Sequence, residues 1–513
     1  MEQLFLDPDE NIFHFRSIDI RETEKSGDHD GVTVVFHYSI NSQHHFESPL
    51  LLDKRWTKEE VDAPPVRRIL FCIGMSVLPW FYFGYGCKTV AISRRKVADL
   101  DEWSLAFWQE TYDEVLREYF YLNKLEHCVK LVLHDSHDDG DDEGERGGGI
   151  AGTSGEEKVV FSRIAGNSTA PQVLVPIGGG KDSLVVLHEC QSEGKDVHLL
   201  YVADGEDEFE DSWRLRKIMK LGSNGDESRR SLCRHVFYDQ TWLQVSRTTL
   251  TEEGHPWAML VLFDSLLIAC LLNIPTISLG FEKSADFGNG VYFNGAEVNH
   301  QYDKSSIFLS RANAYIERNI TEHVKAVSPL AHLWELDISR TFCEHTYLKR
   351  FHGIFLSCNE PVDDTRWCAK CDKCCFVYLL MSAFLPQREV WSIFGENLFE
   401  KEALVPVFLR LVGEAGPGQG SCNANMSSTV SASFKPFDCV GEAWEAAASA
   451  ELAIRRFSAD VAIEGPPFEM PAVVSELCRV LDITGKHWND ASCTEDQIIL
   501  TWLRKKGTQN MIP

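Results

Sequence analysis

The chain has 513 residues, of which 44% are hydrophobic and 25% are charged, a composition typical of a globular protein with two to four domains. Its formal net charge is −27, and this acidic balance excludes the proteins that coat nucleic acid with a basic surface. The sixteen cysteines lie in apolar segments apart from one cluster, which favours a reducing compartment, so we expect a cytoplasmic protein.

The first 134 residues are expected to form a small N-terminal α/β domain. Met1 to Asp7 has no basic segment followed by an apolar core, so no signal or transit peptide is predicted. Apolar spacing in Leu100 to Leu125 predicts a helix. The uncharged stretch Ile69 to Cys87 approaches membrane-spanning length, but it contains glycines, a proline and clustered aromatic residues. We therefore predict a buried strand followed by an aromatic turn there, and no membrane partner.

Two segments are expected to be irregular. Residues 135–170 are acidic and then rich in glycine and serine, which predicts a flexible insertion between domains. Residues 386–513 are expected to form a helical C-terminal region, with a mobile loop at 416–433 and a helix from Glu442 to Arg456.

Residues 171–385 alternate apolar runs with helical patterns, which predicts a parallel sheet with helices on both faces. Ligands in such sheets bind beyond the carboxyl ends of the strands. The glycines after residue 177, Asp204 with Gly205, and Gly280 to Glu282 all follow predicted strands, so we expect them to line one crevice. The predicted strands are 173–177, 197–203, 233–238 and 275–279, and the predicted helices are 181–193, 212–221 and 257–272.

The most informative stretch is the loop Gly178-Gly179-Gly180-Lys181-Asp182-Ser183. A strand that breaks into glycines and restarts as a helix leaves backbone N–H groups unpaired, an arrangement that favours a polyphosphate. It is not a Walker A loop, because an aspartate separates Lys181 from Ser183. The six residues resemble the S-G-G-x-D-S loop of the PP-loop ATP pyrophosphatases, which implies an adenine nucleotide alpha hydrolase-like (HUP-like) fold. Gly178 stands where that family usually has serine. A glycine turn without a ligand is the alternative.

A cluster of cysteines predicts a metal site. Cys368, Cys371 and Cys374 are spaced by two residues, and Cys358 precedes them by ten positions. Four thiolates on short knuckles are typical of structural zinc, while an iron–sulfur cluster or no metal are the alternatives. Cys375 is an alternative fourth ligand, although the apolar run after it indicates that it begins a buried helix.

Segments from about residue 65 to 385 resemble the UDP-N-acetylmuramoyl-L-alanyl-L-glutamate epimerase family. The matching segments are Gly178 to Ser183, Gly280 to Ala285, Val298 to Ser305, Ser328 to Leu330, Ser357 to Asn359, and Trp367 with Cys368. The glycine loop and the cysteine spacing together also resemble the 7-cyano-7-deazaguanine synthases. The epimerase resemblance implies inversion of the terminal L-glutamate of a UDP-linked muramoyl dipeptide through a glutamyl-adenylate. ATP would be consumed, AMP and pyrophosphate released, and Mg²⁺ required as a cofactor.

The resemblance also implies roles for individual residues. Gly178, Gly179, Gly180, Lys181 and Ser183 would bind phosphate, together with Asp182 as a magnesium ligand or helix cap, and Asp204 would belong to the same nucleotide site. Asn299, Gln301, Tyr302 and Ser305 would bind substrate. Inversion needs a proton acceptor and a proton donor, for which the candidates are Glu282, His300, Lys304 and Cys343.

Two other functions remain open alternatives from the sequence. One is an amidating or nucleobase-modifying pyrophosphatase, and the other is a nucleotide-binding regulatory protein without turnover, for which the missing serine at Gly178 is the argument. The oligomeric state is not indicated by any pattern in the chain.

Overall fold

The computed structural model describes residues 11–22, 31–41, 44–53, 55–82, 86–126, 128–135, 170–237, 254–414, 435–464, 470–483 and 494–509. The predicted insertion at 135–170, apart from its two end residues, and the predicted mobile loop at 416–433 lie outside these ranges.

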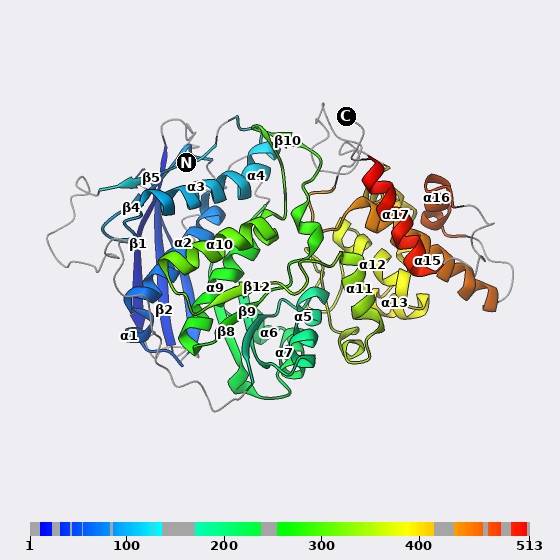
Figure 1. Ribbon diagram of the computed structural model, residues 1–513, viewed down its shortest axis with the longest axis horizontal. Coiled ribbons are helices and arrows are strands. Elements are labelled where there is room, and N and C mark those ends of the chain that lie inside the picture. The colour runs from blue at the N-terminus through cyan, green and yellow to red at the C-terminus, as the bar shows by residue number, and fades with distance from the viewer. Residues whose placement is uncertain are drawn as a thin grey trace.

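Within the described residues, ten strands form one sheet in the order β12-β9-β6-β7-β8-β3-β2-β1-β4-β5 (Figure 1). The pairs β1–β2, β2–β3 and β3–β8 are antiparallel, and the other pairs are parallel. The strands are β1 (Ile12–Glu22), β2 (Gly31–Ile40), β3 (His44–Asp53), β4 (Thr89–Ser93), β5 (Lys130–His134), β6 (Gln172–Pro176), β7 (Asp196–Asp204), β8 (Arg230–His235), β9 (Thr276–Ser278) and β12 (Lys325–Val327), with β10 (Tyr292–Phe293) and β11 (Ala296–Glu297) as a separate hairpin.

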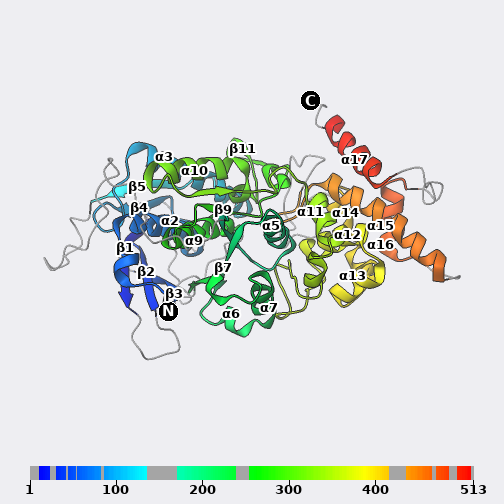
Figure 2. The same cartoon turned by 60° about the horizontal axis from the view of Figure 1, so that its bottom comes forward.

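Helices cover the sheet and continue beyond it at one end. Helices α3 and α10 lie on one side of the sheet and α6 and α7 on the other (Figure 2), while α11 to α17 gather at the end away from β1 to β5 (Figure 1). The helices are α1 (Lys58–Val61), α2 (Pro64–Tyr82), α3 (Glu102–Val115), α4 (Arg117–Leu122), α5 (Lys181–Ser192), α6 (Glu208–Asp211), α7 (Trp213–Gly222), α9 (Trp257–Leu272), α10 (Ser306–Asn319), α11 (Glu335–Glu344), α12 (Asp372–Phe384), α13 (Gln387–Phe394), α14 (Val405–Leu411), α15 (Ala443–Glu464), α16 (Ala472–Val480) and α17 (Glu495–Gln509).

The two faces of the sheet belong to two hydrophobic cores because successive side chains of a strand point in opposite directions. Val173 and Val175 of β6 pack in the core that contains α5, α7, α11 and α12. Leu174, between them, packs in the core that contains α2 and α9. β6 is therefore buried on both faces, as a central parallel strand should be.

The sheet is continuous across the boundary predicted near residue 134. Strand β3 of the N-terminal region pairs with β8 through Leu50↔His235 and Leu52↔Cys233, and α2 packs beside α9. One hydrophobic core includes residues from β1 to β3 together with α9 and α10. The N-terminal region and the following region are thus joined through one sheet and a shared core.

The prediction for Ile69 to Cys87 is wrong, because residues 64–82 form helix α2. The helix is buried on nearly all sides between the sheet and α9. Its sequence therefore lacks the polar face whose 3.6-residue spacing would identify a helix. Pro79 has no N–H to donate to the carbonyl of Met75, four residues earlier in the helix. The Tyr112 hydroxyl donates to Met75 O at 2.6 Å in its place. No helix among the described residues meets the length and hydropathy of a membrane span.

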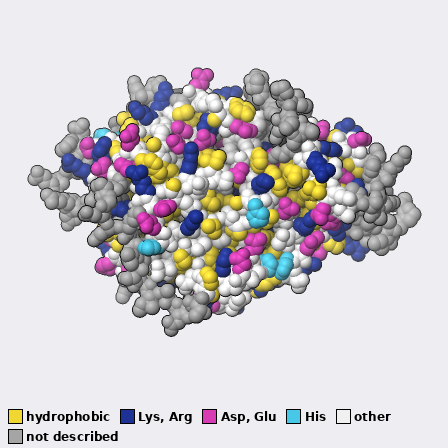
Figure 3. Space-filling view, viewed as in Figure 1, with side chains coloured by type: hydrophobic (Ala, Val, Ile, Leu, Met, Phe, Trp, Pro, Cys, Tyr) yellow, Lys and Arg dark blue, Asp and Glu magenta, His cyan; other side chains and the backbone are white. Residues whose placement is uncertain are grey.

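The other predicted elements of the parallel region are confirmed with small shifts. Helix α9 has its predicted bounds, whereas β8 covers 230–235 in place of 233–238. On the face shown in Figure 3, basic and acidic side chains are interspersed, with hydrophobic side chains in small groups between them.

Candidate active site

The glycine loop joins the carboxyl end of β6 to the first turn of α5. Gly180 is the N-cap of α5 and has no side chain to accept from the first N–H groups of the helix, which leaves them for a ligand. Gly179 has φ +82°, and a β-carbon there would lie 2.5 Å from Arg214 Nη1. Gly178 differs, because a β-carbon there would meet no atom within 4 Å. Glycine is therefore required at 179 and replaceable at 178.

A pocket of about 410 Å³ opens over this loop. Gly178, Gly180, Asp182 and Ser183 line one side. An apolar wall lies on another side and comprises Leu200, Val202, Trp257, Val261 and Leu279. Polar residues from distant segments complete the lining and include Lys304, Ser357, Asn359, Lys373 and Cys439.

The predicted crevice is formed in part. Gly280 and Phe281, which follow β9, line the pocket together with the loop that follows β6. Asp204 is not among the described residues that line it, and its backbone N–H donates to Glu208 Oε2 at 2.7 Å. The loops after β6 and β9 therefore meet, whereas Asp204 lies outside the pocket.

Lys181 lies in a buried charge cluster and is not among the described residues that line the pocket. Its ammonium is 2.5 Å from Asp182 Oδ1 and also pairs with Glu335 Oε2. Lys373 Nζ lies 3.5 Å from the other oxygen of Glu335. Burial alone would raise the pKa of Glu335, but Lys181 and Lys373 outweigh it and lower that pKa to about 2. The cluster joins the first turn of α5 to the first turn of α11.

Glu282 and Lys304 lie at the edge of the pocket. Lys304 lines both the main pocket and a smaller hollow of about 200 Å³, and Glu282 lines the smaller one. Gln301 Nε2 donates to Glu282 Oε1 at 3.0 Å. Burial raises the pKa of Glu282, and the Lys304 ammonium partly offsets this effect. For Lys304, burial lowers the pKa, but Cys439, Glu282 and other acidic groups outweigh it and raise the pKa.

The side chains of the residues predicted to bind substrate form hydrogen bonds to other parts of the protein in this structure. Asn299 Nδ2 donates to Ala285 O at 2.9 Å, and the Tyr302 hydroxyl accepts from Arg311 Nη1 at 3.3 Å. Ser305 caps α10 by accepting from Phe308 N at 3.1 Å. None of Asn299, Gln301, Tyr302 and Ser305 is among the described residues that line the pocket.

His300 lies between two side chains that the sequence analysis did not select. Its Nδ1 is 2.6 Å from Glu118 Oε2, and its Nε2 is 3.7 Å from Cys439 Sγ. Glu118 comes from α4 and Cys439 from the segment before α15. Neither residue belongs to a spacing motif, so no local signal marks them. Cys343, the remaining acid/base candidate, is fully buried in the core around α11 and α12.

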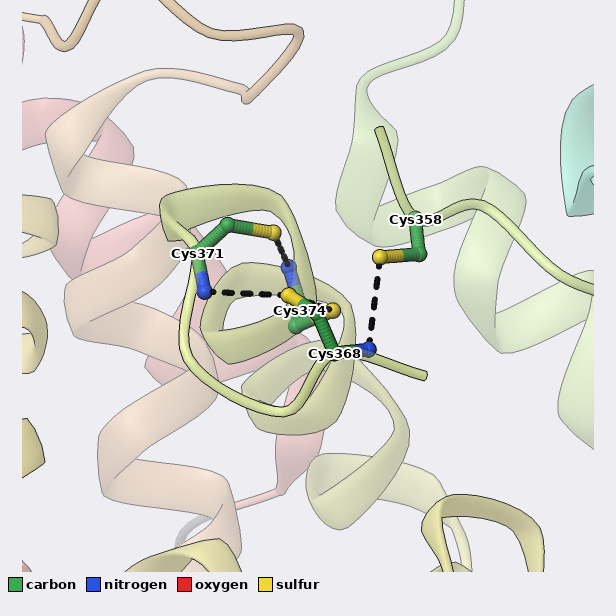
Figure 4. Close-up of side chains that lie close together, drawn as sticks. All are labelled: Cys358, Cys368, Cys371 and Cys374. Atoms are coloured by element: carbon green, nitrogen blue, oxygen red, sulfur yellow. Dashed lines mark hydrogen bonds between the residues drawn. The ribbon is translucent and has the colours of Figure 1, made fainter. Parts of the chain in front are cut away.

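Cys358, Cys368, Cys371 and Cys374 come together, with their sulfur atoms within 4.8 Å of one another (Figure 4). The last three lie on the turn into α12, and Cys358 approaches from a separate segment. Backbone N–H groups face the sulfurs, since Cys371 N lies 3.4 Å from Cys368 Sγ and Cys374 N lies 3.3 Å from Cys371 Sγ. Cys375 is buried inside α12, so the fourth thiol is that of Cys374.

The four thiols fit a tetrahedral ion. Zinc bound to sulfur at about 2.3 Å places sulfur atoms about 3.8 Å apart. Cys368 Sγ and Cys374 Sγ are 3.6 Å apart, so the cluster needs little adjustment to accept such an ion. The N–H groups directed at sulfur stabilise thiolates, which are the form that binds metal.

Fold and pocket together define an α/β protein with a large, mostly parallel sheet and a glycine-loop site at the carboxyl ends of its strands. Residues 11–328 match the family model described as the MurL N-terminal domain, and residues 354–463 match the MurL C-terminal domain. The chain belongs to the MurL family, since the first model alone matches more than half of it. The resemblance to this epimerase family seen in the sequence is thereby confirmed.

Three relatives carry the name UDP-N-acetyl-alpha-D-muramoyl-L-alanyl-L-glutamate epimerase. The protein of Micromonospora sp. is 27% identical over 380 residues, which is 72% of each chain. That of Xanthomonas oryzae pv. oryzae is 30% identical over 292 residues, or 55% of this chain and 57% of the relative. That of Salinispora tropica is 24% identical over 374 residues, or 71% of this chain and 69% of the relative.

Proposed function

We propose that this chain converts the terminal L-glutamate of UDP-N-acetylmuramoyl-L-alanyl-L-glutamate to D-glutamate in an ATP-dependent reaction. The substrate class comes from the names of three relatives that match large parts of the chain. The observation that carries the dependence on ATP is the pocket over the glycine loop, with the N-terminal turn of α5 facing it.

In this proposal the pocket holds ATP and Mg²⁺. The free N–H groups of Gly180 and the first turn of α5 would bind phosphate oxygens, since a helix N-terminus favours anions. The apolar wall of Leu200, Val202, Trp257 and Val261 offers a surface for the adenine ring. Asp182 lines the pocket and supplies a carboxylate oxygen of the kind that Mg²⁺ prefers. The resemblance of this loop to the PP-loop pyrophosphatases supports the same assignment.

Adenylation would solve the chemical problem of inversion. The Cα proton of a free glutamate carboxylate is hard to remove, because deprotonation would add a second negative charge to one small unit. Transfer of AMP to the carboxylate removes its charge and makes the carbonyl a better electron sink, so that side chains can exchange the proton. Pyrophosphate leaves in the first step, and hydrolysis of the acyl adenylate releases AMP.

We also propose a cytoplasmic location, where the UDP-linked precursor would be available. A further proposal is structural zinc at the four-cysteine cluster. The metal proposal is supported by the close approach of the four sulfurs and by the N–H groups that face them. In this proposal the zinc is structural and not catalytic.

The test is incubation of the purified protein with the L,L-dipeptide precursor, ATP and Mg²⁺, followed by hydrolysis and separation of glutamate enantiomers. We expect D-glutamate to appear together with AMP and pyrophosphate. L-glutamate that stays unchanged while ATP stays intact would reject the proposed function. Inversion without ATP would refute the glutamyl-adenylate step but would leave the proposed substrate supported.

A further inference from the structure

The pocket contains a cysteine whose surroundings are those of a reactive thiol. Cys439 lines the pocket, and its Sγ lies 3.7 Å from His300 Nε2. The other nitrogen of His300 lies 2.6 Å from Glu118 Oε2, and the Glu118 side chain is only 3% exposed. A thiol, a histidine and a carboxylate in a row form the arrangement in which the carboxylate orients the ring and the ring holds the thiolate.

The neighbouring segment holds Cys439 in place. Its backbone carbonyl accepts from Lys373 Nζ. The preceding residue, Asp438, accepts from Lys373 N at 2.9 Å and from Asn359. The thiol is therefore supported on the side of the pocket formed by residues 357–373.

Several cations surround the Cys439 sulfur. Burial raises the pKa of the Cys439 thiol, but Lys304 and His300, with a smaller effect from Lys373, outweigh it and lower that pKa. Burial lowers the pKa of His300, and Glu118 and Cys439 outweigh it and raise that pKa. Further charged groups nearby are Lys435 and Asp438, and Asp303 and Glu282 act on Lys304. A thiolate beside an imidazolium is the state that these charges favour.

Other buried thiols of the described chain have no such surroundings. Burial raises the pKa of Cys72, Cys233, Cys270 and Cys343, so these thiols stay neutral in the core. Outside the four-cysteine cluster and among the described residues, Cys439 is the thiol whose pKa is lowered. Cys439 also lines the pocket over the glycine loop.

We propose that Cys439, oriented by His300 and Glu118, removes the Cα proton of the adenylated glutamyl substrate, and that the Lys304 ammonium returns a proton. This inference rests on the proposed epimerase function. Cys439 and Lys304 act as catalytic residues, whereas His300 and Glu118 are positioning residues.

The step balances without any further reagent. The Cα–H bond breaks, its electron pair moves into the adenylated carbonyl, and an S–H bond forms at Cys439. Lys304 then gives a proton to Cα from the other side, which forms the D-centre and leaves a neutral amine. After hydrolysis of the adenylate, the Cys439 thiol releases its proton to solvent and Lys304 takes one up, which restores the starting charges.

The experiment compares the wild-type chain, Cys439→Ser and, as a matched control, Cys128→Ser, which changes an exposed thiol. Each is incubated with the L,L-precursor, ATP and Mg²⁺ in D₂O. We expect Cys439→Ser to lose inversion and deuterium uptake at Cα by about 100-fold or more. It should still release pyrophosphate in the first turnover, which shows a folded, adenylating protein. Cys128→Ser should match the wild type in all three measurements.

Two results would overturn the inference. Deuterium uptake by Cys439→Ser at the wild-type rate would show that another group removes the proton. A glutamyl adduct on Cys439 in the quenched wild-type chain, detected as a mass increase, would show a covalent role in place of proton transfer. Failure of the wild type itself to invert the substrate would instead reject the proposed function, so the two failures are distinguishable.

A second measurement does not depend on turnover. Iodoacetamide should label Cys439 in the wild type, and the label should be suppressed by ATP with precursor, while labelling of Cys128 stays unchanged. In His300→Asn the pH profile of Cys439 labelling should move to higher pH, because the imidazolium that favours the thiolate is lost. If the pH profile of labelling did not move in His300→Asn, a Cys439 thiolate stabilised by His300 would be contradicted. The same holds if Cys439 resisted labelling while Cys128 reacted.

Discussion

The backbone N–H of Leu356 donates to the carbonyl of Gly179 at 3.0 Å. Leu356 lies two residues before Cys358, the first thiol of the four-cysteine cluster. On the same segment, Ser357 Oγ lies 2.9 Å from where a β-carbon on Gly180 would be. The segment that enters the four-cysteine cluster therefore also supports the glycine loop, so a change at the cluster is expected to alter the loop.

Removal of the metal should therefore loosen the loop. We expect the double variant Cys368→Ser/Cys371→Ser to lose zinc by elemental analysis, from about one ion per chain to none. Because the binding energy of a structural site is folding energy, unfolding free energy should fall by about 4 kcal/mol or more, a drop in Tm of about 10 °C. Affinity for ATP should fall as well.

The adjacent buried thiol offers the control for that experiment. Cys375→Ala should keep the zinc, because Cys375 packs inside α12 and is not part of the four-thiol set. A soluble double variant that lacks zinc and binds ATP as the wild type does would contradict the coupling between the cluster and the loop.

If the pocket binds ATP as proposed, a serine at position 178 should strengthen that binding. A side chain at Gly178 would meet no atom within 4 Å, so Gly178→Ser adds a hydroxyl beside the pocket without a clash. One additional hydrogen bond to a charged phosphate contributes about 1.5 to 3 kcal/mol, a gain of about tenfold or more in ATP affinity by calorimetry.

The neighbouring position supplies the matched comparison. Gly179→Ala should lose ATP binding and stability, since φ +82° strains an alanine by about 1 kcal/mol or more and the new carbon would meet Arg214. If Gly178→Ser and Gly179→Ala changed ATP affinity and stability equally, the different backbone geometry of the two positions would be contradicted.

The buried pair of Lys181 and Glu335 should make stability depend on acid pH. The pKa of Glu335 is lowered to about 2, below its value of about 4.3 in an unfolded chain. Its contribution is therefore fully present above about pH 4.3 and is lost as the pH falls toward 2. Glu335→Gln removes this contribution, so its unfolding free energy should change less between pH 4.5 and 2.5, measured by urea denaturation.

At neutral pH the same variant should be less stable by about 3 to 5 kcal/mol, because Lys181 then loses a buried partner. Glu227→Gln, in a side chain that is 90% exposed, is the control and should leave both quantities unchanged. A pH slope in Glu335→Gln as steep as that of the wild type would contradict the role of this pair.

Residues 171–513 should not fold without the N-terminal region. Loss of residues 1–134 would leave β8 without β3 and would expose the face of α9 that packs against α2. An uncovered strand edge and an apolar helix favour aggregation. We expect the fragment to be insoluble alone and to become soluble when residues 1–134 are produced with it, as judged by gel filtration. A folded, monodisperse fragment would show that the boundary separates independent units.

The sequence predicted well those features whose residues are neighbours in the chain. The strand, glycine loop and helix from 172 to 192 follow from one local pattern, and the spacing of Cys368, Cys371 and Cys374 already places three thiols on one turn. Helix α2 was missed for a physical reason. It is buried nearly all round, so its sequence lacks the polar face that separates a helix from a strand.

The sequence by itself therefore determined the glycine loop, the four-cysteine cluster and the family, because each rests on residues close together or on matched segments. Only the tertiary structure decided how the sheet continues from β3 to β8 and which side chains surround the pocket. Glu118, His300 and Cys439 lie on three separated segments, and Lys181 pairs with Glu335 of α11. Such contacts arise from the packing of whole elements, and no local pattern of residues encodes them.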